Sequence, residues 1–342
     1  MFEIIGFIVA VLGIIAIAQV VKVYEASSKL KEKDGNDVTS KDNNTQGRLM
    51  LLFGILFMVS FVAMIIGWGD VMLDTPASEH GSDYDFLWDV SMAIIIVVFV
   101  IVQPILFYFA WKYRGTKGRK ATYYEHNNRL ELIWTVVPAL TLAVLIIYGL
   151  TTWSNVMNPD NEDQEPIVVE LYAQQFYWTA RYAGEDNILG EANVRYIGGS
   201  NVVGINDADA NGHNDIITRE LVLPKGQPVL FKFRSQDIIH SAYFPHFRAQ
   251  MNCVPGMVTQ FQFTPTVSTE EMRRDPSIMQ KVKRINEIRS AEGKESWEFD
   301  YVLLCNKICG AAHYNMQMPI RVVEQEEYDE WISEQKTFLE SL

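Results

Sequence analysis

The chain has 342 residues, of which 49% are hydrophobic, and it carries a formal net charge of −13 at pH 7. The acidic excess lies in residues 151–342, where 17 Lys and Arg side chains stand against 28 Asp and Glu. This charge argues against a nucleic-acid partner and fits either a basic protein partner or a plain solvated acidic surface. The three cysteines are an odd number, so a simple disulfide framework is not expected.

Four apolar segments are each about as long as the roughly 20 residues that cross a bilayer as a helix. They are Phe2–Val21, Leu49–Trp68, Val90–Trp111 and Leu132–Trp153. Tryptophans stand at or near the segment ends, where amphipathic rings prefer the membrane interface. The first segment lacks a basic start and is longer than a signal-peptide core, so we expect a retained helix. The sequence therefore predicts four transmembrane helices.

The charges of the connecting loops predict the orientation of these helices. Residues 22–48 and residues 112–129 each contain six Lys or Arg, whereas residues 69–89 contain none and are acidic. Because basic loops stay in the cytoplasm, we expect the N-terminus, the acidic loop and everything after Trp153 on the outer side. Glu131 stands at the cytoplasmic start of the last span, where a carboxylate faces either lipid headgroups or a water path in protein.

The part of the chain after Trp153 has the pattern of short strands separated by turns. Residues 166–182 are rich in Val, Tyr, Phe and Trp, and residues 229–233 also favour a strand. We therefore predict a membrane-anchored α+β fold, in which an antiparallel β-sandwich or barrel follows the four helices. Two insertions are expected, a polar loop at about 184–215 and a helical excursion at about 268–296, and residues 325–342 are typical of a closing amphipathic helix.

The densest chemical pattern is the run Cys305-Asn-Lys-Ile-Cys309-Gly-Ala-Ala-His313-Tyr-Asn-Met316. Closely spaced thiolate, imidazole and thioether groups on a loop that leaves a strand suit copper, and they resemble the ligands of blue-copper electron-transfer sites. Such sites also take a His from a distant strand. His240, which ends the run Asp-Ile-Ile-His, is placed for that role.

The second cysteine changes the number of metal ions that we expect. One Cys, two His and one Met complete a single-copper site, whereas a second thiolate lets both sulfurs bridge two copper ions. Each ion would also bind one of the two imidazoles. Met316 would complete one copper, and a backbone carbonyl, that of Lys307, would complete the other.

Two alternatives stand beside copper. A Cys305–Cys309 disulfide is plausible outside the cytoplasm, but it would leave the spaced His and Met unexplained. A structural zinc site is the other alternative, and zinc rarely selects Met. The chain has no C-x-x-C-H pattern, so we expect no covalent c-type haem on it.

These features resemble subunit II of cytochrome c oxidase, the haem–copper oxidase component that carries the CuA centre. The resemblance covers about residues 85–265 and 299–323. The motifs that carry it are His126-Asn127 through Leu130-Glu131, Trp134-Thr135 with Pro138, Gln175-Phe176-Tyr177-Trp178, Leu223-Pro224 with Gly226, Asp237 to Ser241, Val254-Pro255-Gly256 and the run from Cys305 to Met316, which we call the copper loop.

By that resemblance the external domain has a cupredoxin-like fold and binds two copper ions. The implied ligands are His240, Cys305, the Lys307 carbonyl, Cys309, His313 and Met316. Electrons from a c-type cytochrome, whether soluble, tethered or part of a supercomplex, would reach this centre and pass to haem and CuB in subunit I. There oxygen becomes water and protons are pumped. The resemblance also implies contacts with other oxidase subunits and membrane lipid, in a bacterial inner membrane with the copper domain on the periplasmic side.

The resemblance assigns roles to two further places. Glu131 matches a carboxylate near the entrance of a proton channel into subunit I. The segment Phe176, Tyr177 and Trp178 matches the aromatic patch for electron uptake, which in the family usually begins with Trp where this chain has Phe176. Phe cannot donate a hydrogen bond but keeps the apolar contact, so Tyr177 or Trp178 would share the role.

Besides Phe176, two further departures from the family separate this chain from its relatives. The family usually has a Glu between its cysteines that helps to bind Mg or Mn at the subunit I interface, and Lys307 argues against that ion here. Two N-terminal spans are also extra, and they would either bind a supercomplex partner or anchor the subunit. The expected divisions are 1–72 (extra hairpin), 73–88 (external loop), 89–154 (subunit II hairpin), 155–324 (copper domain) and 325–342 (C-terminal helix).

Other polar residues fit simpler roles. Asp207, Asp209 and Asn211 resemble the start of a calcium loop, but Thr218 stands where that loop needs a Glu, so an Asx-rich turn is expected. Cys253 is expected to be a buried small apolar residue. His246 is expected to be exposed or hydrogen-bonded rather than a metal ligand.

Overall fold

The computed structural model of the chain describes residues 2–30, 39–69, 73–157 and 164–342. The chain divides into two compact units. One comprises Met1–Gly67 with Ile95–Asn128, and the other comprises Trp68–Ile94 with Arg129–Leu342. The second unit contains the whole β-rich domain.

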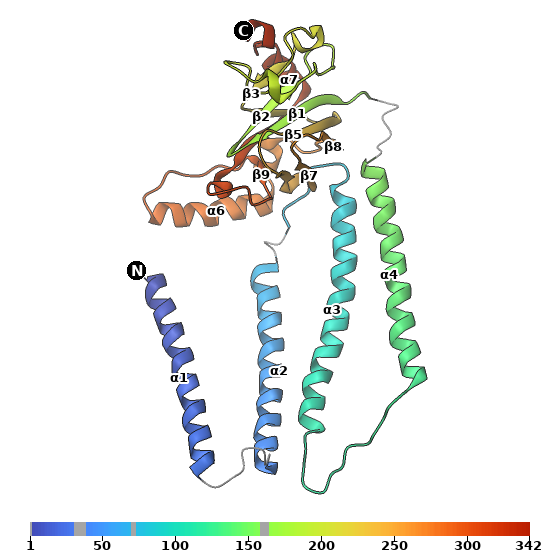
Figure 1. Cartoon of the computed structure of the whole chain (residues 1–342), viewed down its shortest axis with the longest axis vertical. Helices are drawn as coiled ribbons and strands as arrows, with labels where there is room; N and C mark the ends of the chain where they lie inside the picture. Colours follow the sequence, from blue (N-terminus) through green and yellow to red (C-terminus); the bar gives the residue numbers. More distant parts are fainter. Residues whose placement is uncertain (1, 31–38, 70–72, 158–163) are drawn as a thin grey trace. The chain divides into compact units, whose positions relative to one another are not determined.

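Four long helices precede that domain (Figure 1). They are α1 (Phe2–Leu30), α2 (Ser40–Trp68), α3 (Gly81–Lys112) and α4 (Asn128–Met157). Among the described residues, α2, α3 and α4 are long and apolar enough to cross a membrane. The predicted span Phe2–Val21 falls in α1, and the side chains of its first half lie outside the described residues. Three of the four predicted spans are therefore confirmed by length and composition.

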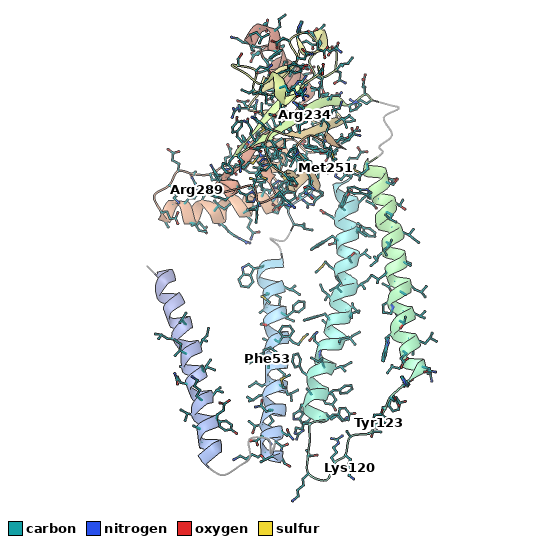
Figure 2. All side chains as sticks on the ribbon, viewed as in Figure 1. Phe53, Lys120, Tyr123, Arg234, Met251 and Arg289 are labelled. Atoms are coloured by element: carbon teal, nitrogen blue, oxygen red, sulfur yellow. The ribbon has the colours of Figure 1, made fainter. Side chains whose placement is uncertain are left out.

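Aromatic side chains pack α2 against α3 in the first unit. The ring centroids of Phe53, which is labelled in Figure 2, and Phe107 lie 5.6 Å apart. Those of Phe61 and Phe99 lie 4.5 Å apart. A Cβ added to Gly54 would come within 2.5 Å of the Phe107 ring, so this glycine permits the close approach of the two helices.

The outer domain is built from two five-stranded sheets. The first has the order β3-β2-β1-β5-β8, made of Ile216–Thr218, Tyr177–Tyr182, Ile167–Gln174, Val229–Ser235 and Thr259–Phe263. The second has the order β4-β10-β9-β6-β7, made of Leu221–Pro224, Gln317–Val323, Tyr301–Cys305, His240–Phe244 and Ala249–Cys253.

The expectation of purely antiparallel sheets is wrong. Strand β1 pairs with β5 in parallel, and β4 pairs with β10 in parallel. Parallel neighbours need a crossover of roughly a dozen residues or more. Both connections are long enough, because β2 to β4 intervene in the first pair and β5 to β9 in the second. The remaining ladders are antiparallel, so both sheets are mixed.

A buried aromatic core joins the sheets. In β5 the residues Val229, Phe231, Phe233 and Ser235 are buried while those between them are partly exposed. The Phe231 ring centroid lies 5.2 Å from that of Phe244 on β6, which fixes one sheet against the other. Strand β6 also pairs with β9, so the start of β6 and the end of β9 lie at the same end of the second sheet.

Helices and short turns complete the domain. The helices are α5 (Thr269–Arg273), α6 (Pro276–Ala291), α7 (Gln325–Ser333) and α8 (Phe338–Ser341), and the 3-10 turns are η2 (Val194–Tyr196), η3 (Ala210–Gly212), η4 (Pro245–Phe247) and η5 (His313–Asn315). The C-terminal segment thus forms two short helices rather than one. A new helix starts after Thr337 because its side chain and that of Glu340 form a capping box.

The loop between β2 and β3 packs on charged side chains of the first sheet. Arg181 Nε donates to Asp215 Oδ2 at 2.9 Å, and Arg234, labelled in Figure 2, donates to both oxygens of Glu170 at 2.7 and 2.9 Å. Glu170, Arg181 and Asp215 are buried. We call Glu170, Arg181, Asp215 and Arg234 the charge cluster.

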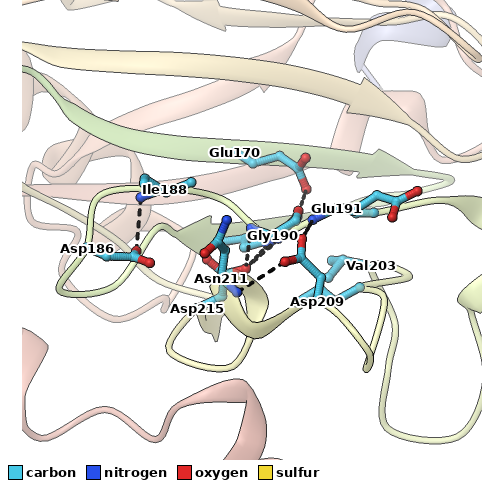
Figure 3. Close-up of polar contacts among 12 residues, drawn as sticks. Glu170, Asp186, Ile188, Gly190, Glu191, Val203, Asp209, Asn211 and Asp215 are labelled. Atoms are coloured by element: carbon cyan, nitrogen blue, oxygen red, sulfur yellow. Dashed lines mark hydrogen bonds and ion pairs between the residues drawn. The ribbon is translucent and has the colours of Figure 1, made fainter.

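The calcium-like segment in this loop is an Asx-rich turn, as expected from the sequence (Figure 3). Asp209 accepts hydrogen bonds from the backbone N–H groups of Glu191 at 2.6 Å and Asn211 at 3.2 Å. It caps the turn η3 with the same carboxylate. Both carboxylate oxygens of Asp209 therefore accept hydrogen bonds from backbone N–H groups of the loop.

Candidate metal centre

The metal-ligating residues come from one strand start, one strand end and the loop that follows it. His240 begins β6, Cys305 ends β9, and the loop runs on through η5 to Met316. Two backbone hydrogen bonds of 3.0 Å close the loop, from Cys305 N to the Met316 carbonyl and from Asn306 N to the Ser241 carbonyl. The loop is therefore held at both ends against the second sheet.

The two cysteine sulfurs lie at the centre of the group. They are 3.9 Å apart, far beyond the about 2 Å of a disulfide bond. Cys305 Sγ lies 3.8 Å from His240 Nδ1 and 3.2 Å from the Lys307 carbonyl oxygen. The ligating atoms of His240, Cys305 and Cys309 all lie within 4.8 Å of one another.

The second sulfur has its own pair of neighbours. Cys309 Sγ lies 3.5 Å from His313 Nδ1 and 3.8 Å from Met316 Sδ. The structure therefore brings together all six groups that the sequence selects. The His240 imidazole and the Lys307 carbonyl lie nearest Cys305 Sγ, whereas the His313 imidazole and the Met316 sulfur lie nearest Cys309 Sγ.

The cluster is shielded from solvent. His240 is fully buried, Cys309 and Met316 are each 1% exposed, and Cys305 is 8% exposed, while His313 is half-buried. Burial raises the pKa of Cys309, and the neighbouring Cys305 adds to that shift. In the metal-free protein this thiol is therefore protonated at neutral pH, and metal binding must release its proton.

Asp237 orients His240. Its Oδ1 lies 2.8 Å from His240 Nε2, on the side of the ring away from Cys305. Burial alone would raise the pKa of Asp237, but hydrogen bonds from His240, Gln175 N and Ile238 N outweigh it and lower that pKa. The ionised carboxylate favours a proton on Nε2, which leaves the Nδ1 lone pair free for a metal.

Gln175 ties the copper loop to the first sheet. Its backbone N–H donates to Asp237 Oδ2 at 2.8 Å, and its side-chain amide donates to the Cys309 carbonyl at 2.5 Å. Gly310 follows with φ +136°, and a Cβ there would lie 2.9 Å from both the Gln175 amide and the Phe176 ring. A glycine is required at this point because the loop passes so close to residues 175 and 176. The roles of Asp237 and Gln175 were not predicted, although both lie in motifs noted in the sequence.

The aromatic segment is divided between surface and core. Phe176 and Tyr177 are half-buried, and the Arg219 guanidinium lies 4.1 Å from the Tyr177 ring centroid. Trp178 is 1% exposed, and its ring centroid lies 6.3 Å from that of His240 in an edge-on arrangement. Phe176 and Tyr177 are therefore partly accessible at the surface, whereas Trp178 lies in the interior, beside His240.

The other predicted residues lie outside the group of ligating atoms. Glu131 is half-buried in the first turn of α4. Cys253 is fully buried on β7, where burial raises its pKa to about 12. His246 is buried rather than exposed, and its Nε2 lies 3.3 Å from Asp74 Oδ2.

The donor set fits copper. Two thiolates, a thioether and two imidazoles form a soft site, and the sulfur of Met316 distinguishes it from ordinary structural zinc. Because the sulfurs are buried and the His240 ring is held in place, the ligands would move little when a bound metal gains or loses an electron. What the arrangement can do is hold a redox metal near the surface of a rigid domain.

Comparisons with known proteins show the family of the chain. The family described as cytochrome c oxidase subunit II, transmembrane domain, matches residues 66–152, and its periplasmic domain matches residues 167–270. The alternative cytochrome c oxidase subunit 2 of Bradyrhizobium diazoefficiens is 30% identical over 289 residues, which cover 82% of this chain and 92% of that relative.

The chain also matches proteins of lower identity. The cytochrome c oxidase subunit 2 of Cereibacter sphaeroides is 21% identical over 78% of this chain and 80% of its own length. A probable quinol oxidase subunit 2 of Staphylococcus epidermidis is 24% identical over 63% of this chain and 49% of its own length. Among solved structures, the periplasmic domain of subunit II of the cytochrome oxidase of Bradyrhizobium japonicum covers 52% of this chain and 95% of its own, with 17% identity and a TM-score of 0.31.

Proposed function

The chain belongs to the subunit II family of cytochrome c oxidases, and we propose that its outer domain is the electron-accepting module of a respiratory oxidase, with a binuclear copper centre. The chain is a membrane-anchored subunit of a haem–copper oxidase, with its β-rich domain on the outer side. In the proposed role it accepts electrons from a c-type cytochrome and delivers them to haem in subunit I. There, with CuB, oxygen is reduced to water and protons are pumped.

The observation that carries this proposal is a pair of sulfurs surrounded by two imidazoles, a thioether and a backbone carbonyl. His240 Nδ1 and the Lys307 carbonyl lie nearest Cys305 Sγ, and His313 Nδ1 and Met316 Sδ lie nearest Cys309 Sγ. A single-copper site needs one thiolate, so the second sulfur at 3.9 Å supports two bridged ions. When bound, a pair of copper ions takes up and releases one electron that both metals share.

The chain's own residues shield the site from water and hold its ligands in place. The buried thiolates exclude water and spread the charge change, while Asp237 holds His240 in one orientation. Because the loop is pinned at both ends, its ligands move little when the charge changes. A small movement of ligands suits a relay rather than a catalyst.

The path of electrons into the site is assigned to the aromatic segment. The half-buried Phe176 and Tyr177 would meet the donor, and the buried Trp178 would lie between them and His240. The net acidic charge of residues 151–342 suits a basic cytochrome. We assign Glu131 to proton uptake on the cytoplasmic side. Lys307 stands where the family has a carboxylate, which argues against a neighbouring Mg or Mn ion.

The test is an electron paramagnetic resonance spectrum of the purified full-length chain loaded with copper. We expect a seven-line signal, because one unpaired electron is shared equally by two copper nuclei. A four-line signal would indicate a single copper, and a folded chain without copper uptake would indicate a docking subunit of the quinol oxidase type. Either result would overturn the proposal.

Two cysteine variants make a matched pair for this test. Cys305→Ser should abolish the seven-line pattern because it removes a bridging sulfur. Cys253→Ser should keep the pattern, because that thiol is buried on β7 outside the group of ligating atoms. Loss of the pattern in the Cys253 variant of a folded chain would mean that the bridging sulfurs have been misassigned.

A further inference from the structure

Helix α6 differs in charge from the domain that carries it. Within Pro276–Ala291 it has four basic side chains, Lys281, Lys283, Arg284 and Arg289, and one acidic side chain, Glu287. The rest of the outer domain has an acidic excess. The helix also follows residue 270, where the match to the family's periplasmic domain ends. It is thus a basic addition to an acidic domain, and its charge calls for an anionic partner.

A network of hydrogen bonds ties α6 to the start of the membrane helix α3. Lys281 Nζ lies 2.6 Å from Asp74 Oδ2, and Thr75 Oγ1 donates to Asp275 at 2.9 Å. The guanidinium of Arg248 donates to both the Asp74 carbonyl at 2.5 Å and Asp85 Oδ2 at 2.9 Å. One side chain therefore holds Asp74 beside Asp85, which belongs to the second turn of α3.

These contacts place α6 at the depth of the lipid headgroups. The apolar part of α3 begins at Val90, five residues after Asp85, and five residues of helix rise about 7.5 Å. The headgroup layer on each side of a bilayer is roughly 5–8 Å thick. Asp85 and its neighbour Asp74 therefore lie at the outer edge of that layer. Lys281 reaches the same level because it binds Asp74.

One flank of α6 carries both charge and apolar surface at this level. With about 100° between successive residues of a helix, Lys281, Arg284 and Ile288 form a single stripe. Arg284 is exposed and Ile288 is 62% exposed. The opposite flank carries Met279, which is 56% exposed, and Lys283. Ile278 is fully buried and faces the domain.

We propose that α6 is an interfacial helix that rests on the outer leaflet, with Lys281 and Arg284 contacting anionic phospholipid headgroups and Ile288 entering the layer beneath them. A basic amphipathic helix held beside a transmembrane helix binds anionic lipid through both charge and apolar contact. The contact steadies the outer domain against the membrane. It does not depend on copper, so its failure would leave the proposed electron-transfer role untouched.

The test uses photo-crosslinking in membranes that contain the whole oxidase. The photoreactive residue p-benzoylphenylalanine replaces Ile288 in one variant and Met279 in its control, because the two positions are similarly exposed and lie on opposite flanks. After irradiation, mass spectrometry identifies the adducts. We expect phospholipid adducts at position 288 and several-fold fewer at position 279. Protein adducts at position 288, or equal lipid yields at the two positions, would overturn the proposal.

A second measurement separates charge from mere proximity. The full-length chain with p-benzoylphenylalanine at position 288 is placed in phosphatidylcholine nanodiscs with and without phosphatidylglycerol. Arg284→Gln should lower the yield of phosphatidylglycerol adducts roughly fivefold, the usual effect of one basic residue near an anionic surface. Lys283→Gln, on the other flank, should leave the yield unchanged. Equal yields in the two variants would refute a specific contact of this flank with anionic lipid.

Discussion

The charge cluster and the copper loop both bury polar groups in the outer domain, but they satisfy those groups in different ways. In the charge cluster, fixed charges pair directly, as in the contacts of 2.7 and 2.9 Å between Arg234 and Glu170. In the copper loop, sulfur and imidazole atoms stand 3.5–3.9 Å from one another. The first spacing is that of completed ion pairs, and the second agrees with the proposal that these groups are ligands of a metal ion.

This difference separates a structural use of buried polarity from a chemical one. A buried ion pair is costly to break, since removing one partner leaves the other charge without compensation. A set of neutral thiols and imidazoles can stay buried without its metal at a lower cost, because none of these groups must be charged. We therefore expect damage to the charge cluster to unfold the domain and damage near the copper loop to alter metal binding.

The largest effect is expected from Arg181→Met. Arg181 is fully buried and pairs with Asp215, so its loss should lower the free energy of unfolding by about 3–5 kcal/mol. The measurement is chemical denaturation of the full-length chain in detergent, followed by near-ultraviolet circular dichroism.

The matched control is Arg195→Met in the loop between β2 and β3, because Arg195 is exposed. Its effect should stay within about 0.5 kcal/mol. If both variants lose the same free energy of unfolding, the charge cluster does not stabilise the domain as proposed. At temperatures where the Arg181 variant stays folded, its copper signal should be that of the unmodified chain.

The two regions were not equally predictable. Four of the proposed copper-ligating side chains lie within twelve residues of one another, so a single loop gathers them and the spacing alone indicates the chemistry. The charge cluster is assembled from Glu170, Arg181, Asp215 and Arg234, which are distant in the chain. Nothing in their local sequence distinguishes them from ordinary surface charges. They become buried because the loop at 184–215 covers that face of the sheet.

The relative direction of paired strands and the face on which each side chain is buried could not be predicted from the sequence either. Richness in β-branched and aromatic residues indicates that β1 is a strand, and alternating polarity indicates the same for β5, but neither pattern distinguishes parallel from antiparallel partners. Alternation also places Tyr177 and Trp178 on opposite faces of β2 without saying which face is buried. The structure assigns Trp178 to the interior, which moves it from the donor surface to the neighbourhood of His240.

An intermediate effect is expected from Asp237→Ala, which tests the copper loop. The change removes the acceptor for His240 Nε2 at 2.8 Å and frees the ring to turn. Loss of such a partner costs roughly 10- to 100-fold in metal affinity. The measurement is copper retention by the full-length chain against a competing chelator.

Asp237→Asn is the graded control for this change. It keeps an acceptor oxygen for the His240 ring while it removes the charge, so its loss of affinity should be smaller than that of Asp237→Ala. The free energy of unfolding of the metal-free chain should change far less in either variant than in Arg181→Met. Equal copper retention in Asp237→Ala and the unmodified chain would show that the ring is oriented by something else.

The smallest effect is expected from Tyr172→Phe, beside the charge cluster. The Tyr172 ring lies 4.8 Å from the Arg234 guanidinium, and within the described residues its buried hydroxyl has no hydrogen-bond partner. Removing an unpaired buried hydroxyl should leave the free energy of unfolding unchanged or raise it by up to about 1 kcal/mol.

Tyr182→Phe is the matched control, because that hydroxyl donates to the Val222 carbonyl at 2.8 Å and accepts from Val222 N at 2.9 Å. It should lose about 1–3 kcal/mol in the same denaturation experiment. If Tyr172→Phe loses as much as Tyr182→Phe, the Tyr172 hydroxyl is bonded in solution and belongs to the charge cluster.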